Sequence, residues 1–321
     1  MQKSKVFVTR EIPEKGLRLV RDFCDAEVWP GEMPPSRDAL LHAVENVDGV
    51  LSLLTDRIDA VLMDSARKLR VISNMAVGVD NVEIPAATAR HIPVGNTPGA
   101  MTDATADMTF ALMMAAARRI VEGEKYVRGG KWKTWGPQLL LGADFAGSTW
   151  GIIGFGRIGQ AVARRARGFD LRVIYHDPQA APVYDAVPVS LEQLLRTADF
   201  ISIHVPLTTA TRHMINTETL RLVKPGAILV NTARGPVVDH DALYAALKGN
   251  QLFAAALDVT EPEPIPADHP LLELTNCIIV PHLGSASRWT RDQMAYLAAQ
   301  NLISGLKGER LPHCVNPEVY G

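Results

Sequence analysis

Short apolar runs rich in β-branched residues alternate with amphipathic stretches from one end of the chain to the other. Alternation of this kind predicts βα units built around parallel sheets. Several runs are apolar almost throughout, as expected for strands that helices cover on both faces. The predicted strands are residues 6–9, 26–29, 50–54, 71–75, 149–153, 171–175, 200–205, 227–231, 253–258 and 277–280. The pattern therefore predicts an α/β fold with two Rossmann-like or flavodoxin-like lobes and a cleft between them.

Two segments mark the boundaries of the lobes along the chain. A Pro-Gly turn in residues 96–99 ends the first sheet before a long helix that begins near Thr102. A second helix, expected at about residues 286–308, returns to the first lobe. The first domain is then discontinuous and comprises residues 1–98 plus 286–321, and the second comprises residues 99–285. Clefts between such domains favour small ligands.

Composition narrows the class of partner. Of the 321 residues, 47% are hydrophobic and 21% are charged, and the formal net charge is −2. This composition is typical of a water-soluble globular protein. A net charge near zero argues against nucleic acid or a membrane surface as partner, because both usually leave a basic footprint. The most apolar helical stretch, residues 108–117, is shorter than the ~20 residues of a bilayer span, so we interpret it as a buried helix.

The cysteines and the N-terminus indicate a compartment. Three cysteines, Cys24, Cys277 and Cys314, occur without a C-x-x-C spacing. Neither a disulfide framework nor a metal site is expected from them. The N-terminus runs directly into a predicted strand and lacks the apolar core of a secretory signal. These features favour the reducing environment of the cytoplasm.

A glycine-rich turn carries the first chemical signal. Gly154, Gly156 and Gly159 form a G-x-G-x-x-G motif that follows a predicted strand and opens a helix. In this context the first glycine permits the tight turn, the second lets a pyrophosphate approach the backbone, and the third allows close helix–strand packing. The helix N-terminus then offers N–H groups to the phosphates. Residues 99–285 are therefore predicted to be an NAD-binding Rossmann domain, and residues 1–98 plus 286–321 a substrate-binding (catalytic) domain.

Asp177, after the next predicted strand, bears on the choice of cofactor. Its carboxylate can accept hydrogen bonds from the adenosine ribose and would repel a 2′-phosphate, and residues 178–181 contain no arginine. These features favour NAD(H) over NADP(H). The alternative is a glycine-rich turn without a ligand and an aspartate that only caps a strand. Arg157 either touches the pyrophosphate or is an exposed arginine at the start of the helix.

Three charged residues follow predicted strands of the second lobe, where α/β sheets form their ligand crevice. Arg234 offers a planar fork that matches a carboxylate and can polarise a carbonyl. His282 is a suitable acid near neutral pH, and a carboxylate beside it would keep it protonated. Glu263 and Glu261 compete as that carboxylate, and the residues alone do not choose between them. The set suits reduction of a 2-keto acid by hydride transfer.

His176, His204 and His240 also stand near predicted sheet ends, but they lack a comparable pattern of partners.

The motifs around these residues resemble the D-isomer-specific 2-hydroxyacid dehydrogenase family, nearest its glyoxylate/hydroxypyruvate reductase branch. The resemblance spans nearly the whole chain and includes residues 77–80, 96–99 and 102–107. It implies NAD(H)-dependent reduction of glyoxylate or hydroxypyruvate to the D-2-hydroxy acid. Arg234 would bind the carboxylate, His282 would act as acid/base, and Glu263 rather than Glu261 would orient it.

The resemblance also implies further contacts. Backbone N–H groups of Val77 and Gly78 would bind the substrate carboxylate, and Asp258 would face the nicotinamide amide. Leu53 either contacts the substrate or packs in the core, as does the adjacent Leu54. Ser285 either contacts the substrate or forms a turn. Thr102 either contacts the cofactor or caps the helix. The remaining implied cofactor contacts are Ile158, Val205, Pro206, Thr232, Ala233 and Gly284.

Other functions and the assembly stay open at this stage. Alternatives are another dehydrogenase of the family, such as one acting on phosphoglycerate, phosphite or another D-2-hydroxy acid, or a non-enzymatic NAD-sensing binding protein. A phosphorylated substrate would require extra cations, and the first lobe shows no obvious cluster. The resemblance implies a homodimer through the cofactor domains, with residues 132–141 as an exposed arm. Some relatives carry an aromatic residue near the neighbouring active site where this chain has Leu139.

Overall fold

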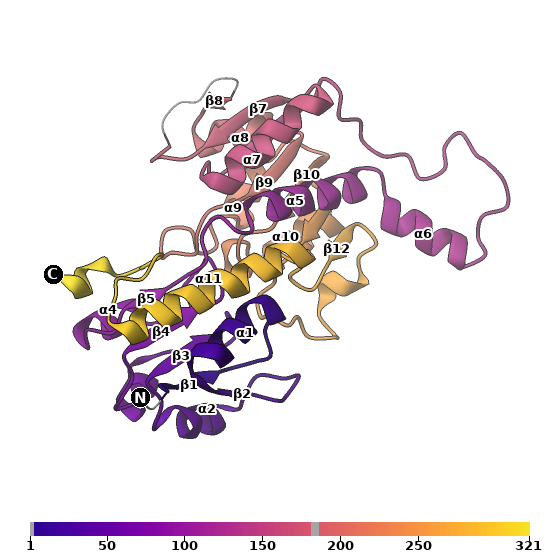
Figure 1. The fold of residues 1–321 in the computed structure, drawn as a ribbon. Helices are drawn as coiled ribbons and strands as arrows, with labels where there is room; N and C mark the ends of the chain where they lie inside the picture. The colour runs from indigo at the N-terminus through magenta and orange to yellow at the C-terminus, as the bar shows by residue number, and fades with distance from the viewer. Residues whose placement is uncertain (1–2, 181–185) are drawn as a thin grey trace. The chain divides into compact units, whose positions relative to one another are not determined.

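The computed structural model describes residues 3–180 and 186–321 (Figure 1). The chain divides into two compact units, Met1–Met101 with Ser287–Gly321, and Thr102–Ala286. The divisions thus fall at 101/102 and 286/287, against 98/99 and 285/286 in the sequence-based assignment. The predicted cleft between the domains stays a prediction.

The first unit is a parallel sheet with the strand order β2-β1-β3-β4-β5. This is the order of flavodoxin-like folds. The strands are β1 (Lys5–Val8), β2 (Asp25–Val28), β3 (Gly49–Ser52), β4 (Val71–Asn74) and β5 (Val94–Gly95). The helices are α1 (Glu14–Phe23), α2 (Arg37–Val44), α3 (Ala60–Ser65), α4 (Ile84–Ala89) and α11 (Arg288–Lys307), with the 3-10 turn η4 (Pro317–Tyr320).

Alternation along β1 separates two cores. Val6 and Val8 pack with Leu302 of α11 on one face, whereas Phe7 packs with Leu62 of α3 on the other. Helix α11 lies so close to α1 that a Cβ on Gly16 would meet the carbonyl oxygen of Ala295 at 2.3 Å. The C-terminal helix therefore completes the first unit, as the sequence predicts.

The second unit is a parallel sheet with the strand order β12-β11-β10-β9-β6-β7-β8. Its strands are β6 (Thr149–Ile153), β7 (Arg172–His176), β8 (Val187–Pro188), β9 (Phe200–Ile203), β10 (Ala227–Asn231), β11 (Leu252–Leu257) and β12 (Cys277–Ile279). Its helices are α5 (Thr102–Ala117), α6 (Ile120–Arg128), α7 (Arg157–Ala166), α8 (Leu191–Thr197), α9 (Thr217–Leu222) and α10 (His240–Lys248). Its 3-10 turns are η1 (Arg167–Phe169), η2 (Gly235–Val237) and η3 (Pro270–Glu273).

Both faces of this sheet are covered. On one face Trp150 and Phe200 pack with Phe110 of α5, and on the other Ile201 packs with Leu243 of α10. The apolar stretch 108–117 lies within α5, where half of the helix is buried, so its interpretation as a buried helix is confirmed. Among the described residues, no helix is long and apolar enough to cross a membrane.

The structure corrects several predicted strand ends. Strand β3 ends at Ser52, so Leu53 and Leu54 belong to the loop that follows it. Strand β9 ends at Ile203 and β11 at Leu257, which leaves Val205 and Asp258 in loops. The two-residue strands β5 and β8 were not predicted, because runs that short have no readable periodicity.

Candidate active site

Three neighbouring strands bring the charged residues to one edge of the second unit. Arg234 follows β10, Glu263 follows β11 and His282 follows β12, and these strands are adjacent and parallel. Their carboxyl ends therefore share one sheet edge, where ligands of such folds bind. The structure thus groups residues that the sequence separates by up to 48 positions (282 − 234).

An asparagine shapes the loop that carries Arg234. The side-chain amide of Asn231 donates to the Arg234 carbonyl at 2.8 Å, and its oxygen accepts the Ala233 N–H at 3.0 Å. The Arg234 guanidinium itself donates to the Ala233 carbonyl at 2.7 Å. Sequence reasoning missed Asn231, although an asparagine at the end of a buried strand is a recognisable signal for such a turn.

His282 and Glu263 form a direct pair. The His282 Nδ1 lies 2.6 Å from Glu263 Oε1, and the backbone N–H of Thr260 donates to Glu263 Oε2 at 3.3 Å. Burial acts to raise the pKa of Glu263, but the His282 hydrogen bond and charge, the Thr260 bond and the Arg234 charge together lower it. Glu263 is therefore ionised near neutral pH. A carboxylate at Nδ1 keeps a proton on that nitrogen and leaves Nε2 for proton exchange.

The backbone at His282 is held in an uncommon conformation. Its φ is +54°, in the left-handed region that non-glycine residues seldom adopt. The His282 N–H donates to the Asp258 carbonyl at 2.9 Å, and the Asp258 carboxylate accepts the N–H groups of Leu283 at 2.6 Å and Gly284 at 2.9 Å. Asp258 is buried, and burial raises its pKa. Strain of this kind is kept where surrounding contacts over-determine it, as these do.

Glu261, the rival of Glu263, has other partners. Its Oε2 lies 2.7 Å from His213 Nε2, and its Oε1 accepts a hydrogen bond from Arg212. Burial acts to raise the pKa of Glu261, but these two partners lower it. The geometry thus separates two carboxylates between which the residues alone could not choose. Arg212 and His213 were not singled out from the sequence.

The glycine motif forms the turn between β6 and α7. Gly154 has a φ of +89°, and a Cβ there would meet the backbone carbon of His204 at 2.7 Å. A Cβ on Gly159 would meet the Gly154 carbonyl oxygen at 2.2 Å, so α7 packs directly on the turn. Gly156 caps α7, and a Cβ there would meet nothing within 4 Å. The open space in front of a helix N-terminus fits the pyrophosphate of a dinucleotide.

Asp177 follows β7 and faces this turn. Its carboxylate accepts the N–H of Phe155 at 2.8 Å and that of Gln179 at 2.9 Å. Asp177 therefore braces the glycine motif, which is compatible with a further hydrogen bond to a ribose. The arginine-free stretch includes Ala181, which lies outside the described residues. Arg157, at the first position of α7, is exposed, and Ile158 packs against the core.

The other predicted cofactor residues of the second unit lie around the same sheet edge. Val205 and Pro206 follow β9, and Thr232 and Ala233 follow β10. The Thr232 hydroxyl lies 3.0 Å from that of Thr109 on α5, and Gly284 accepts from Thr105 at 3.2 Å. Thr102 begins α5 and is half-buried, whereas Ser285, one of the predicted substrate contacts, is buried.

The remaining predicted substrate residues belong to the first unit and follow its strands. Val77 and Gly78 follow β4, where their carbonyls accept from Asn96 at 2.8 Å and Asn74 at 3.1 Å. Leu53 follows β3 and packs against the core while remaining half-buried. Its carbonyl accepts from Asn81 at 3.0 Å. Asparagine side chains thus fix the loops at the carboxyl edge of this sheet.

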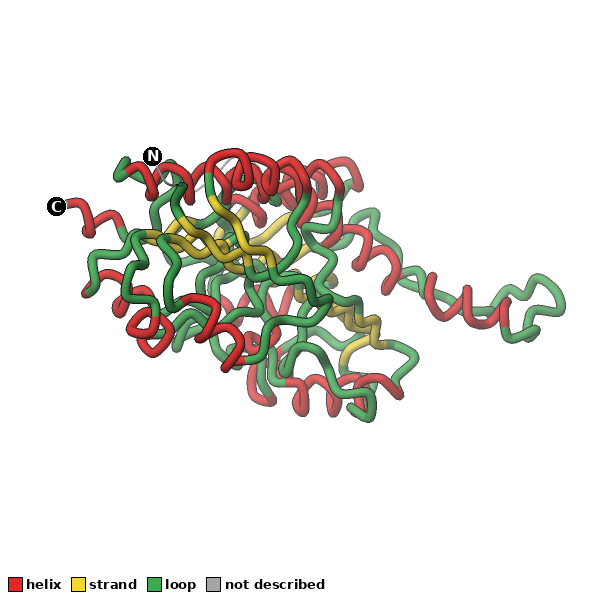
Figure 2. Tube along the Cα trace, turned by 60° about the horizontal axis from the view of Figure 1, so that its bottom comes forward, coloured by secondary structure: helices red, strands yellow, loops and turns green. Residues whose placement is uncertain are grey.

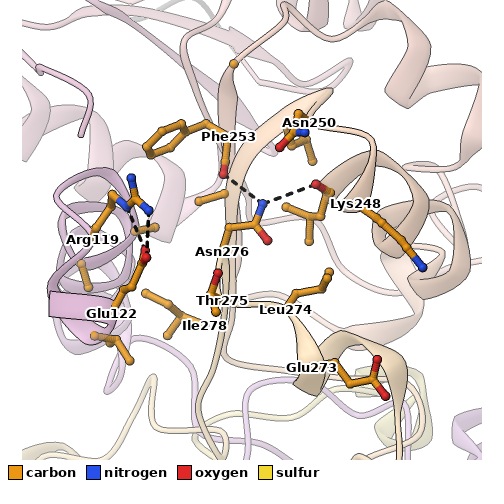
Figure 3. A pocket seen from close by; sticks show the side chains of 17 residues that line it. Arg119, Glu122, Lys248, Asn250, Phe253, Glu273, Leu274, Thr275, Asn276 and Ile278 are labelled. Carbon is orange, nitrogen blue, oxygen red and sulfur yellow. Dashed lines mark hydrogen bonds and ion pairs between the residues drawn. The ribbon is translucent and has the colours of Figure 1, made fainter. Parts of the chain in front are cut away.

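A pocket of about 530 Å³ lies elsewhere in the second unit (Figure 3). Arg119 and Glu122 pair on one side of it, and Asn276 bonds across its floor to the carbonyl of Phe253 at 3.2 Å. Its lining includes the first residues of β11 and the two residues before β12, at the amino edge of the sheet, opposite the charged residues. The described residues contain no cluster of three or more side chains suited to a metal ion.

Comparison with known proteins identifies the class and then the family. A sequence model described as D-isomer specific 2-hydroxyacid dehydrogenase, NAD binding domain, matches residues 110–284. The protein is therefore a dehydrogenase with a nicotinamide-cofactor domain. A glyoxylate reductase of Korarchaeum cryptofilum is 51% identical over 322 residues, which cover 99% of this chain and 97% of the relative. The chain belongs to the D-isomer-specific 2-hydroxyacid dehydrogenase family.

Solved structures agree with this assignment. A protein from Thermus thermophilus shares 50% identity at a TM-score of 0.93, with coverage of 97% of this chain and 99% of that chain. An NADPH-dependent glyoxylate/hydroxypyruvate reductase from Sinorhizobium meliloti, in complex with NADP and malonate, shares 28% identity at a TM-score of 0.87. It covers 99% of this chain and 98% of its own. The predicted fold class, family and enzymatic nature are thereby confirmed.

Proposed function

We propose that this enzyme reduces a small 2-keto acid, glyoxylate or hydroxypyruvate, to the D-2-hydroxy acid with NADH. The observation that carries the proposal is the 2.6 Å contact of His282 Nδ1 with an ionised Glu263, beside the charge of Arg234. A proton donor and a carboxylate-binding cation are the two groups that reduction of a keto acid requires. The activity named for the Korarchaeum relative supports the choice of substrate.

Each residue has a separate task in this mechanism. The bound nicotinamide cofactor supplies the hydride. Arg234 binds the substrate carboxylate and polarises the carbonyl, and Ser285 contacts the remainder of the substrate. His282 gives its Nε2 proton to the carbonyl oxygen, and the Glu263 charge stabilises the protonated imidazole before transfer. Asp258 holds the His282 loop by its two backbone hydrogen bonds, and the family resemblance assigns it to the side of the nicotinamide amide.

NAD(H) is the proposed cofactor because Asp177 stands beside the glycine turn. A carboxylate at this point accepts hydrogen bonds from a ribose diol and opposes a 2′-phosphate. The Sinorhizobium relative is named as NADPH-dependent, so family membership by itself leaves the choice open.

A substrate panel tests the proposed reaction. NADH consumption is measured with glyoxylate, hydroxypyruvate, pyruvate and longer keto acids, and kcat/KM should be highest for one of the first two. His282→Ala should slow the reaction by ~10²–10⁴-fold, as expected when a general acid is lost. Wild-type activity in His282→Ala, or higher kcat/KM for the longer acids, would contradict the proposal.

We further propose a homodimer that uses the arm at residues 132–141. Helix α6 and the loop after it extend away from the sheet of the second unit in both views (Figures 1 and 2). Large apolar side chains are exposed along this segment, with Trp132 60%, Trp135 78% and Leu141 58% exposed. Clustered exposed apolar groups of this kind are typical of protein–protein contacts. A second copy of the chain is the proposed partner.

A further inference from the structure

A half-buried histidine outside the proposed acid/base pair stands at the end of β9. We propose that His204 is a positioning residue that links the Arg234 loop to the His282 loop through hydrogen bonds of Thr232, Thr109 and Thr105. Its importance for catalysis rests on the proposed function, whereas the chain of hydrogen bonds itself can be tested without activity. Every group in it belongs to the second unit.

The first half of the chain runs from the core to the Arg234 loop. Trp150 Nε1 lies 2.9 Å from Ser202 Oγ, and both residues are fully buried. Ser202 Oγ lies 2.9 Å from His204 Nε2. On the other side of the ring, His204 Nδ1 lies 3.5 Å from the hydroxyl of Thr232, which is the longest link. Thr232 is two residues before Arg234.

The second half continues from Thr232 through α5. The hydroxyls of Thr232 and Thr109 lie 3.0 Å apart. Thr109 donates to the carbonyl of Thr105 at 2.8 Å, and the Thr105 hydroxyl donates to the Gly284 carbonyl at 3.2 Å. Gly284 is two residues after His282, and its N–H is held by Asp258. One helix thus connects the loops that carry the proposed cation and the proposed acid.

The donors and acceptors determine the direction of the chain. An indole N–H can only donate, so Ser202 accepts from Trp150 and is free to donate its own proton to His204 Nε2. At the other end Thr109 must donate to a carbonyl, so it accepts from Thr232. Thr232 is then an acceptor for a proton on His204 Nδ1.

The Thr232 end therefore selects the neutral ring of His204 with its proton on Nδ1, and the Ser202 end is compatible with that form. Burial lowers the pKa of His204 to about 3, which agrees with a neutral ring at neutral pH. In the opposite tautomer, His204 Nδ1 would carry a lone pair instead of a proton. That lone pair would face the Thr232 oxygen, whose own proton is already donated to Thr109. Directed chains of this kind rigidify the groups at their ends.

Two substitutions separate the two sides of the ring. His204→Asn keeps an amide near the Nδ1 position, facing Thr232, whereas His204→Gln extends past it toward Ser202. Both variants are neutral and polar, so they lose comparable packing. We expect kcat/KM to fall by up to about tenfold in His204→Gln, the effect of one neutral hydrogen bond. His204→Asn should retain activity closer to wild type, and the loss in His204→Gln should lie in kcat more than in KM.

A double-mutant cycle tests whether the effect passes through Thr232. Thr232→Val removes the hydroxyl at nearly constant volume, and combined with His204→Gln it should add little further loss. Equal kcat/KM in His204→Asn and His204→Gln, or strictly additive losses in the cycle, would overturn the positioning role.

The tautomer gives a readout that needs no turnover. Long-range ¹H–¹⁵N spectra of ¹⁵N-histidine-labelled protein, assigned by the signal that His204→Gln removes, should show His204 as the Nδ1–H form at pH 7. An Nε2–H or imidazolium signal would refute the chain, whatever the enzyme reduces. An inactive wild type with the Nδ1–H signal would count against the proposed reaction while the chain stands.

Discussion

Glu261 and Glu263 are separated by a single proline, yet they have different partners. Glu263 contacts His282 at 2.6 Å, and Glu261 contacts His213 at 2.7 Å together with Arg212. Both carboxyl pKa values are lowered against the effect of burial, so both groups carry charge near neutral pH. Only the Glu263 charge is placed to act on the proposed acid.

We predict that Glu263→Gln moves the alkaline limb of the reduction profile to lower pH. Reduction needs the protonated imidazole, so the rate is high below the limb and falls as pH rises through it. The glutamine amide can still accept from Nδ1, but the negative charge that favours the imidazolium is gone. The shift should be about one pH unit or more, measured as kcat/KM against pH.

Glu261→Gln is the matched control for this prediction. It removes the same charge two residues away, from a group that contacts Arg212 and His213, and it should leave the limb in place. A limb that moves in Glu261→Gln but not in Glu263→Gln would exchange the roles of the two residues.

We predict that Asp177 determines the cofactor preference. In wild type the preference for NADH should be a hundredfold or more in kcat/KM. Charge-assisted hydrogen bonds of ~1.5–3 kcal/mol combine here with repulsion of a 2′-phosphate. Asp177→Ala should lose much of this preference by weakening NADH and relieving NADPH.

Asp177 also accepts a hydrogen bond from the Phe155 N–H, and Asp177→Ala would remove that bond together with the charge. Asp177→Asn is therefore the control that separates the two effects. It keeps the size of the side chain and an oxygen acceptor but removes the charge. Use of both cofactors with equal efficiency by wild type would refute the assignment.

At the scale of elements, the contact between α7 and its turn depends on glycines with different duties. A Cβ at Gly159 would press on the Gly154 carbonyl at 2.2 Å, whereas a Cβ at Gly156 would meet nothing within 4 Å. Gly159 therefore permits close packing of α7 on the turn, whereas Gly156 leaves space open in front of the helix.

We predict that Gly159→Ala and Gly156→Ala separate stability from cofactor binding. Gly159→Ala should lower the free energy of unfolding by about 1–3 kcal/mol, because the backbone must shift to admit the methyl group. Gly156→Ala should leave stability nearly unchanged but weaken NADH binding, because the methyl group would occupy the space proposed for the pyrophosphate. Denaturant unfolding and NADH fluorescence titration measure the two effects. If Gly156→Ala bound NADH as tightly as wild type, the pyrophosphate would not bind at this turn.

At the scale of the whole molecule, the arm predicts the assembly. The protein should sediment as a dimer at assay concentrations, because a single chain leaves Trp132 and Trp135 largely exposed. Deleting residues 138–141 should reduce activity more than it reduces the melting temperature. Analytical ultracentrifugation of wild type provides the check, and a fully active monomer would refute the proposal.

The sequence by itself determined the fold class, most elements and the family. Strands buried on both faces are readable as apolar runs, and β6 and β10 have the predicted bounds, each preceded by a glycine-containing turn. The glycine motif is readable because its physical requirements are local. Strand ends such as that of β3 were misjudged, since Leu53 and Leu54 continue the apolar run into a loop.

Tertiary structure decided which side chains meet. The residues alone left Glu261 and Glu263 as equal candidates, and only the positions of His213 and His282 assign each its partner. Likewise the sequence placed His204 near a sheet end but could not show its partner pattern, because Thr232 and, beyond it, Thr109 come from separate elements. Periodicity and turns depend on neighbours along the chain, whereas a hydrogen-bond partner depends on distances between loops that only the packing of the sheet and α5 sets.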